Sequence, residues 1–436
     1  MRFAPEVLAP DPARRRVILE ILEHAIDAVD PERVIRGALE GTGRGLLACG
    51  EEVGAPDGVT VLALGKAAPS MAEAALDVLG DLVVDGVVAS PWGTGPPGLV
   101  ARRGGHPVPD RGSIAAGEAL LDAARRAGRA GSGRVVLVLL SGGGSATAEV
   151  PWPGLTLDDL AATTSALLRS GADITQVNAV RKHCSALKGG RLATAAHPAR
   201  LVTLVISDVA GNPLDVIASG PTVPDPSTFA GALEVARGAP AAPAVLAHLE
   251  SGTAGGVPET PVGGPVFDRQ VIEVIADGAA AAHAAARAAR GNGIEARVQG
   301  TNLAGEARDA GTDVASAARA LGGMHVWAGE TTVEVLGRGL GGRNQELALA
   351  AGITLEGDDR VVVASLGTDG VDGPTDAAGA IGDGGTVARG MRARRDARAA
   401  LAANDAHPYL EAAGDLLVTG PTGTNVGDVV IAWRSC

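Results

Sequence analysis

The sequence predicts an α/β protein with two α/β domains, the first of them a doubly wound parallel sheet. The chain has 436 residues, which is more than one ordinary hydrophobic core accommodates. Continuous apolar runs such as Val59–Leu64 alternate with amphipathic segments. Such runs are typical of strands buried on both faces of a parallel sheet, with helices as crossovers. Several of these runs end in a glycine-rich or acidic turn, where ligands of open α/β sheets bind.

The first half of the chain supplies the elements of this sheet in order. Residues 14–39 carry apolar side chains at helical spacing and are expected to form two short helices broken near Pro31. The helix from Leu157 has Thr156 as its expected N-cap. Strands are expected at 59–64, 86–90, 134–140 and 200–206, and further helices at 70–82 and 113–128. This order of elements is that of a Rossmann-like layer.

A compositional change marks the second half. Residues 238–265 are rich in Ala, Pro, Gly and Thr, so we expect the domain boundary or a linker at about residue 250. The predicted domains are therefore 1–250 and 251–436. The second domain is expected to contain strands at 270–278, 294–300, 325–337 and 360–370, and helices running to residue 290 and at 306–322 and 344–352.

Composition excludes several classes of partner. Aromatic residues make up 2% of the chain and the formal net charge is −13, which argues against a nucleic-acid partner. Cys49, Cys184 and Cys436 lack metal-ligand spacing and fit a reducing compartment. No apolar run reaches the length of a membrane span and no signal peptide is recognised, so a cytoplasmic protein is expected.

Lysine is rare in this chain. Of 37 Lys and Arg residues, the lysines are Lys66, Lys182 and Lys188. Lysine offers a compact point charge with a shiftable pKa, whereas arginine is a fixed planar fork. Lys182 is expected on a solvated basic helix face. Lys188, which precedes two glycines, is expected either to serve a helix end or to contact a phosphate group.

A glycine loop follows the third predicted strand. In "SGGGS", Ser141, Gly142, Gly143, Gly144 and Ser145 expose successive backbone amides, as an anion-binding nest does. A tight strand-to-helix turn is the alternative, and the flanking serines favour phosphate. Lys66 also follows a strand, but its neighbours do not form a P-loop motif. His106 is expected in a loop, where it is a candidate ligand contact.

The second half contains a GxGxxG pattern at Gly337, Gly339 and Gly342. A dinucleotide site would need an acidic residue at the end of the next strand, and the acids at that distance fall in a turn instead. Arg343 follows at once, which suits a phosphoryl group better than NAD.

Two acids follow buried strands in glycine-containing turns. Asp208 and Asp369 are either ordinary turn residues or ligands that share a Mg²⁺ with nucleotide oxygens. Asp372 and Asp376 are expected to shape the turn. Glu330 is a further acid expected at the carboxyl-end edge of the sheet.

The motifs "LGKAAPSM", "GGHPVPD", "SGGGSA", "NAVRKHCSALKGGRLA", "GGRNQELALA", "GTDGVDGPTDAAGA" and "TGPTGTNVGD" together resemble the type II glycerate kinases. This is the glycerate 2-kinase family of the DUF4147/MOFRL type, and the MOFRL region would span about 325–432. The resemblance implies ATP-dependent phosphorylation of D-glycerate at its C2 hydroxyl, with Mg²⁺, in a cleft between two α/β domains. Members have also been labelled hydroxypyruvate reductases, and a non-catalytic sugar-acid sensor is a third hypothesis.

The resemblance also implies residue roles. Lys66, Arg343 and Asp208 would be catalytic, and Asp208 and Asp369 would bind the metal. The loop from Ser141 to Ser145, together with Lys188, would bind ATP, whereas Lys66, Arg343, Asn344 and Asp369 would bind D-glycerate. The chain departs from the pattern at Asn212, where an acidic residue is expected. It is expected to be a monomer or a homodimer.

Overall fold

The computed structural model describes residues 3–435, which form two compact units. The middle unit comprises Pro31–Ile206 and Asn212–Ile275. The terminal unit comprises the residues up to Asp30, Ser207–Gly211 and the residues from Ala276 onward. Each unit contains a six-stranded sheet with helices, so the predicted α/β class is confirmed. The division into domains 1–250 and 251–436 stays a prediction.

The middle unit begins at the second helix of the chain. Its strands are β1 (Leu39–Thr42), β2 (Gly45–Ala48), β3 (Glu51–Gly54), β4 (Val59–Leu64), β5 (Val83–Ser90), β6 (Val100–Arg103), β7 (Val135–Leu140), β8 (Arg200–Ile206) and β9 (Val271–Ala276). Its helices are α2 (Pro31–Ala38), α3 (Ala68–Leu79), α4 (Arg111–Ala130), α5 (Gly144–Thr147), α6 (Leu157–Arg169), α7 (Ile174–His183), α8 (Arg191–Ala196), α9 (Phe229–Arg237) and α10 (Pro243–Thr253), with 3-10 turns η2 (Gly80–Leu82) and η3 (Ile217–Ser219).

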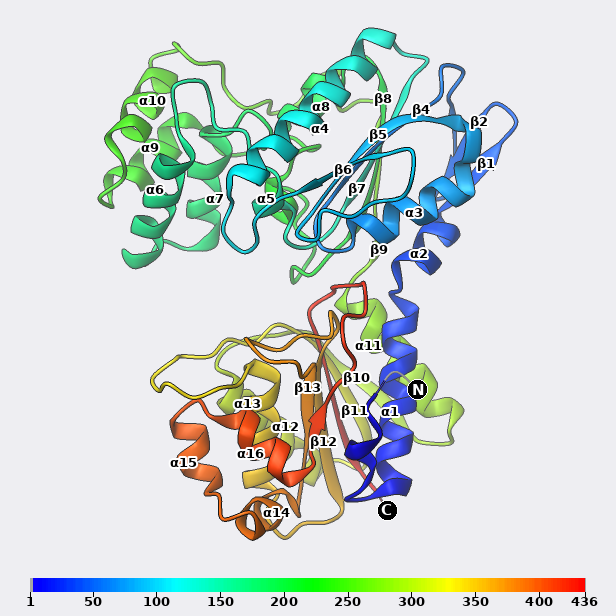
Figure 1. The fold of residues 1–436 in the computed structure, drawn as a ribbon, viewed down its shortest axis with the longest axis vertical. Helices are drawn as coiled ribbons and strands as arrows, with labels where there is room; N and C mark the ends of the chain where they lie inside the picture. Colours follow the sequence, from blue (N-terminus) through cyan, green and yellow to red (C-terminus); the bar gives the residue numbers. More distant parts are fainter. Residues whose placement is uncertain (1–2, 436) are drawn as a thin grey trace. The chain divides into compact units, whose positions relative to one another are not determined.

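The main sheet of this unit is doubly wound. Its strand order is β6-β5-β4-β7-β8-β9, and the pairings from β6 to β8 are parallel. From β4 the chain crosses to β5, the neighbour of β4 on one side. From β6 it returns past these strands to β7, the neighbour of β4 on the other side. Because such crossovers are right-handed, α3 and α4 cover opposite faces (Figure 1). Every residue of β4 and β7 is buried, as their continuous apolar runs predict.

A group of helices lies beside this sheet. α6, α7, α9 and α10 share one hydrophobic core, in which Phe229, Val245 and Leu249 are fully or almost fully buried (Figure 1). Residue 250, near which the domain boundary or a linker was expected, lies in a helix, because α10 forms over Pro243–Thr253. Its proline occupies the first turn, where no backbone donor is lost, and its apolar side chains join the core.

The terminal unit contains a mixed sheet. Its strands are β10 (Ala296–Leu303), β11 (Gly323–Gly329), β12 (Val361–Gly367), β13 (Gly379–Asp383), β14 (Leu416–Leu417) and β15 (Asp428–Arg434). Its helices are α1 (Pro12–Ala28), α11 (Gly278–Gly291), α12 (Ala307–Ala320), α13 (Arg343–Thr354), α14 (Thr386–Arg392), α15 (Ala397–Ala402) and α16 (Ala406–Ala413), after a 3-10 turn η1 (Pro5–Leu8). Figure 1 shows α1 and α11 on one side of the sheet and α12 and α13 on the other.

The strand order, β10-β11-β15-β12-β13-β14, places the last strand of the chain between two strands that run the opposite way. Asp428, the first residue of β15, pairs with Gly329 at the end of β11 and with Gly367 at the end of β12. The predicted strand at 325–337 is wrong beyond Gly329, since the chain leaves the sheet there. An acidic side chain therefore lies between two carboxyl-terminal strand ends.

A buried ionic cluster attaches α1 to the terminal unit. Arg15 is fully buried and donates hydrogen bonds to Asp383 over 2.7 Å and to Asp415 over 2.6 Å. Arg389 donates to the same two carboxylates, and Asp415 is also fully buried. The pairing matters because an unpaired charge at this depth would cost several kcal/mol. It explains how a helix at the start of the sequence belongs to the unit that ends it.

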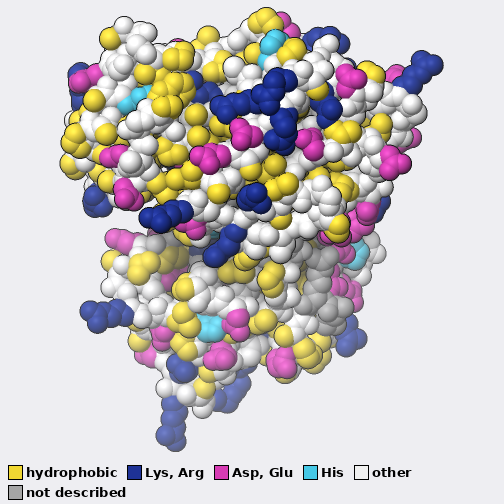
Figure 2. Space-filling view, turned by 45° about the horizontal axis from the view of Figure 1, so that its top comes forward, with side chains coloured by type: hydrophobic (Ala, Val, Ile, Leu, Met, Phe, Trp, Pro, Cys, Tyr) yellow, Lys and Arg dark blue, Asp and Glu magenta, His cyan; other side chains and the backbone are white. Residues whose placement is uncertain are grey.

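Two expectations from the sequence bear on the described residues, one on membrane-spanning helices and one on surface charge. No helix in this part of the chain is long and apolar enough to cross a membrane. Figure 2 shows a face on which Asp and Glu side chains lie among the Lys and Arg side chains.

Replacement of Arg15 tests the ionic cluster. We expect Arg15→Ala to lower the free energy of unfolding by about 3–5 kcal/mol, because the carboxylates of Asp383 and Asp415 would share Arg389 alone and leave one negative charge in the cluster uncompensated. Chemical denaturation followed by circular dichroism measures this change. Arg16→Ala, an exposed neighbour on the same helix, is the control and should change stability by less than about 0.5 kcal/mol. Equal stability of the two variants would contradict the role assigned to Arg15.

Candidate active site

The middle unit brings Lys66 and the glycine loop together at the carboxyl ends of two neighbouring strands. Lys66 follows β4 and the glycine loop, Ser141–Ser145, follows β7. The Lys66 amide donates to the carbonyl of Gly142 over 2.9 Å, and the Ala67 amide donates to Ser141 Oγ over 3.0 Å. Gly65 has a φ of +118°, and a Cβ there would collide with Ser141. The turn therefore requires glycine.

Two adjacent backbone amides of the glycine loop are unpaired within the described part of the chain. Among the described residues, the amides of Gly142 and Gly143 find no acceptor. Gly143 has a φ of +81°, and a Cβ there would lie 2.8 Å from the His106 ring and 3.5 Å from Cγ of Lys66. Lys66 and His106 therefore lie beside the loop. Adjacent unpaired amides with a lysine beside them are suited to bind an anion.

The two other lysines are buried and paired. Lys182 Nζ lies 3.2 Å from both Asp215 and Asp225, so the expected solvated face is wrong for this residue. Lys188 is 1% exposed and forms an ion pair with Glu149. Burial lowers the pKa of Lys188 to about 8, against the opposing effect of Glu149. A phosphate contact from Lys188 stays a prediction, and it would require this pair to open.

In the terminal unit, two acids hold Arg343. This residue begins α13 and donates two parallel hydrogen bonds to Asp428, from Nε over 2.6 Å and from Nη2 over 2.8 Å. Its third nitrogen, Nη1, lies 2.9 Å from Glu330. Burial alone would lower the pKa of Arg343, but the contacts with Asp428 and Glu330 outweigh it and raise the pKa. Such a fork fixes the plane of the guanidinium.

A buried polar network supports this arginine. Asn344 is 1% exposed and donates to Asp428 over 2.9 Å and to Asp372 over 3.2 Å. Asp372 also accepts from the backbone amides of Asn344 and Gln345 at the start of α13. Burial raises the pKa of Asp372, although these amide hydrogen bonds oppose the shift. Asp372 is thus structural, as predicted, but it caps a helix as well as shaping its own turn.

Arg343 borders a cavity of about 530 Å³. The loop 330–342 forms one wall, and Glu346 and Asn404 line another part. The three glycines of the GxGxxG pattern serve packing here, since a Cβ on Gly337 or Gly339 would meet the backbone of 403–405, and one on Gly342 would meet Asp372. The pattern also lacks the strand that should lead directly into it. These observations agree with the argument against a dinucleotide.

Asp208 and Asp369 border the same segment, 422–427. Asp208 accepts a hydrogen bond from Asn425 Nδ2 over 2.8 Å. The Asp369 carbonyl accepts from the amide of Thr422, while its carboxylate accepts from the amide of Val371 over 3.1 Å. Among residues 3–435, no cluster of three or more His, Cys, Asp or Glu side chains could hold a metal ion. A site of two carboxylates completed by phosphate oxygens is compatible with this finding.

Asn212, where the sequence departs from the pattern of the resembling family, has a left-handed backbone conformation. Its φ is +53°. Among non-glycine residues, Asn is one of the few that adopt this conformation readily.

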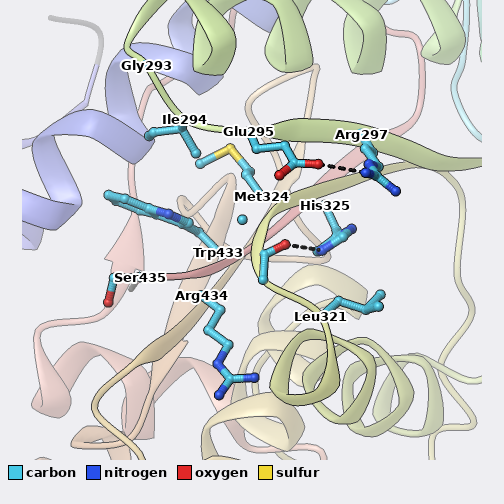
Figure 3. A pocket seen from close by; sticks show the side chains of 12 residues that line it. Gly293, Ile294, Glu295, Arg297, Leu321, Met324, His325, Trp433, Arg434 and Ser435 are labelled. Atoms are coloured by element: carbon cyan, nitrogen blue, oxygen red, sulfur yellow. Dashed lines mark hydrogen bonds and ion pairs between the residues drawn. The ribbon is translucent and has the colours of Figure 1, made fainter.

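A second cavity of the terminal unit contains none of the predicted residues. It has a volume of about 630 Å³ and lies where β11 begins and β15 ends (Figure 3). Arg297, which lines it, is paired with Glu295, and His325 bonds to the carbonyl of Gly322 over 3.0 Å. Ligands of α/β sheets bind at the carboxyl ends of parallel strands, which is the opposite end of β11. The cavity beside Arg343 is therefore the better candidate.

Sequence reasoning missed the acids that hold the site's cations. Asp428 lies in the motif "TGPTGTNVGD", but its place depends on an antiparallel strand that the alternating pattern did not suggest. Glu149, the partner of Lys188, lies among apolar residues shortly after the glycine loop. An acid in such a place indicates a buried cationic partner, and this signal was available in the sequence. His183 likewise has an acidic partner far along the chain, since its Nε2 lies 2.6 Å from Glu259 across 76 residues.

The chain matches two family models and several known proteins. The model described as a domain of unknown function, DUF4147, matches residues 17–250, and that of the MOFRL family matches residues 323–428. A protein from Thermotoga maritima named D-glycerate 2-kinase is 40% identical over 98% of this chain and 99% of its own. A relative from Agrobacterium vitis, provisionally named a hydroxypyruvate reductase, is 38% identical over 96% of this chain and 94% of its own.

A solved structure is similar as well. The crystal structure of a glycerate kinase from Thermotoga maritima has a TM-score of 0.86 at 38% identity and covers 97% of this chain and 100% of that chain. The resemblance of the motifs is confirmed by the matched models and by relatives aligned over almost their whole length. This chain belongs to the glycerate 2-kinase family.

Proposed function

We propose that this enzyme transfers the γ-phosphoryl group of ATP to the C2 hydroxyl of D-glycerate, which yields 2-phosphoglycerate and ADP. The observation that carries the proposal is the position of Lys66 beside two unpaired amides of the glycine loop. An ammonium next to such amides suits a transferring phosphoryl group, whose charge increases on its peripheral oxygens. The names of the relatives from Thermotoga maritima support glycerate as the acceptor.

In this mechanism the glycine loop binds the nucleotide phosphates. The amides of Gly142 and Gly143 donate to phosphate oxygens, and Gly144 and Ser145 complete the loop. Ser141 has a structural part, because its hydroxyl accepts from the Ala67 amide and so keeps Lys66 close to the loop. Lys66 then neutralises the group in transfer. Most of the rate enhancement would come from positioning and charge neutralisation.

Arg343 is proposed to bind the carboxylate of glycerate or the group in transfer. Its fork to Asp428 uses two nitrogens and the third, Nη1, contacts Glu330, so a substrate carboxylate would have to take the place of Glu330 at Nη1. The cavity beside Arg343 is large enough for a three-carbon acid. Asn344 is buried, which favours a part in positioning Asp428 over direct contact with the substrate. We therefore propose that the pair formed by Asp428 and Asn344 orients Arg343.

Asp208 and Asp369 are the proposed ligands of Mg²⁺. Two carboxylates beside one polar segment fit an ion that prefers one or two carboxylates plus phosphate oxygens. When bound, the ion would neutralise charge on the phosphates. Asp208 is also the candidate that accepts the proton of the C2 hydroxyl, because an amide from Asn425 holds its carboxylate in place.

A hydroxypyruvate reductase is the second candidate function, and the name of one relative favours it. Hydride transfer from NADH would need a dinucleotide site. The glycines that match GxGxxG pack against 403–405 and Asp372 and do not follow a strand. The kinase is therefore the better supported proposal.

The two functions are separated by one pair of assays. With ATP, Mg²⁺ and D-glycerate, we expect ³¹P NMR to detect 2-phosphoglycerate together with ADP. With NADH and hydroxypyruvate, we expect no comparable loss of NADH absorbance. Formation of 3-phosphoglycerate would contradict the proposed C2 attack, and NADH oxidation faster than phosphorylation would reverse the order of the two functions.

Replacement of Lys66 tests its charge. We expect Lys66→Met to lower kcat on the order of 10³-fold, because the group in transfer loses a neutralising cation. Lys66→Arg should also be impaired, since a planar fork is not equivalent to a compact point charge beside the glycine loop. Steady-state kinetics with circular dichroism as a folding control measures both. Near-normal kcat in Lys66→Met would remove the residue from the mechanism.

The metal proposal is tested by magnesium titration. Asp208→Asn and Asp369→Asn should each raise the Mg²⁺ concentration for half-maximal rate by at least about tenfold, because each amide removes a charged ligand. Asp376→Asn serves as a control, since Asp376 is exposed and assigned no metal role. An unchanged Mg²⁺ dependence in both site variants would show that these carboxylates do not bind the ion.

A further inference from the structure

The middle unit has a second feature beside its glycine loop, an apolar cavity of about 370 Å³. α6, α7 and the segment Pro107–Pro109 form its walls. Three of its apolar side chains are unusually exposed, with Val108 at 64%, Leu168 at 58% and Ile174 at 59%. Figure 2 shows hydrophobic side chains gathered on the side of this unit where Figure 1 places α6, α9 and α10. Apolar surface in a concave, open site is typical of ligand binding.

The cavity continues the glycine loop. Ser145 belongs to the loop and also lines the cavity. Arg181 lines it from α7 and donates to the carbonyl of Ser145 over 3.1 Å, which holds this end of the loop against the helix. α6 and α7 both begin with a capping box, formed by Thr156 with Asp159 and by Asp173 with Gln176. These caps stabilise the starts of both wall helices. A ligand with its anionic end on the loop would extend into an apolar slot between them.

The two substrates of the proposed reaction differ in how they suit this slot. D-glycerate is small and carries a polar group on each carbon, so aliphatic walls would leave those groups without partners. A nucleoside has a flat base with two apolar faces, and its volume suits a cavity in the usual range for ligands. Thr164 and Ser165, which also line the cavity, offer hydroxyls that could meet the polar edge of a base.

We propose that this cavity binds the nucleoside of ATP, with the base between the aliphatic side chains of α6 and α7. The inference rests on the proposed function, since it takes ATP as the phosphoryl donor. It adds a binding site that lies wholly within the middle unit. No aromatic side chain is among the described residues that line it. Recognition would therefore depend on aliphatic contact with the base and on the hydroxyls at its edge.

Two alanines on α6 provide a matched test. Ala161 lines the cavity, whereas Ala162, the next residue, is exposed and does not. We expect Ala161→Trp to fill the cavity and to raise the Kd of ATP by at least about tenfold, which corresponds to about 1.4 kcal/mol. The Kd of tripolyphosphate, which has no nucleoside, should stay unchanged, and Ala162→Trp should alter neither value. Isothermal titration of the full chain with Mg²⁺ and without glycerate measures all of these.

The outcomes separate this inference from the proposed function. If wild-type protein phosphorylates glycerate while Ala161→Trp binds ATP normally, the cavity is not the nucleoside site and only this inference fails. If wild-type protein binds no ATP, both fail. Should Ala161→Trp fold poorly, Leu168→Ala replaces it, because this exposed side chain can be shortened without a cavity in the core. A severalfold weaker affinity for ATP alone is expected there, and no change would overturn the inference.

Discussion

The buried polar network around Arg343 in the terminal unit depends on Asp428. This residue begins β15 between the ends of β11 and β12, so the sheet itself positions its carboxylate. A carboxylate that is 3% exposed is costly unless it is paired. Burial raises the pKa of Asp428, and the hydrogen bonds from Arg343 act against that shift. The pair therefore fixes the start of α13, and the network through Asn344 and Asp372 follows from it.

In the middle unit, too, buried charges are paired. Lys182 and Lys188 are buried against Asp225 and Glu149, so their charges are used within the fold. Lys66 is only partly buried and lies in a glycine turn, where two neighbouring amides have no acceptor among residues 3–435. An anion that binds there would be held by donors that the turn fixes and by a cation. Such preorganised groups account for much of the rate enhancement in phosphoryl transfer.

Much of this could be predicted from the sequence, and the failures have physical causes. The buried strands β4, β7 and β12 were predicted because continuous apolar runs need no tertiary information. The glycine loop and Lys66 were predicted to follow strands, and parallel pairing of β4 with β7 brings them together. Three features were not predicted because each depends on a partner distant in the chain. They are the burial of Lys182, the paired hydrogen bonds from Arg343 to Asp428, and the hydrogen bonds by which Arg15 attaches α1 to the terminal unit. Local composition carries no signal for such contacts.

The central claim is that Lys66 and the glycine loop hold the group in transfer. A crystal structure with Mg²⁺, D-glycerate and a non-hydrolysable ATP analogue tests it most directly. The account predicts that phosphate oxygens lie within hydrogen-bond distance of the amides of Gly142 and Gly143 and of Lys66 Nζ. Phosphates bound away from the glycine loop, for example in the cavity of Figure 3 beside Arg297 and Arg434, would contradict it.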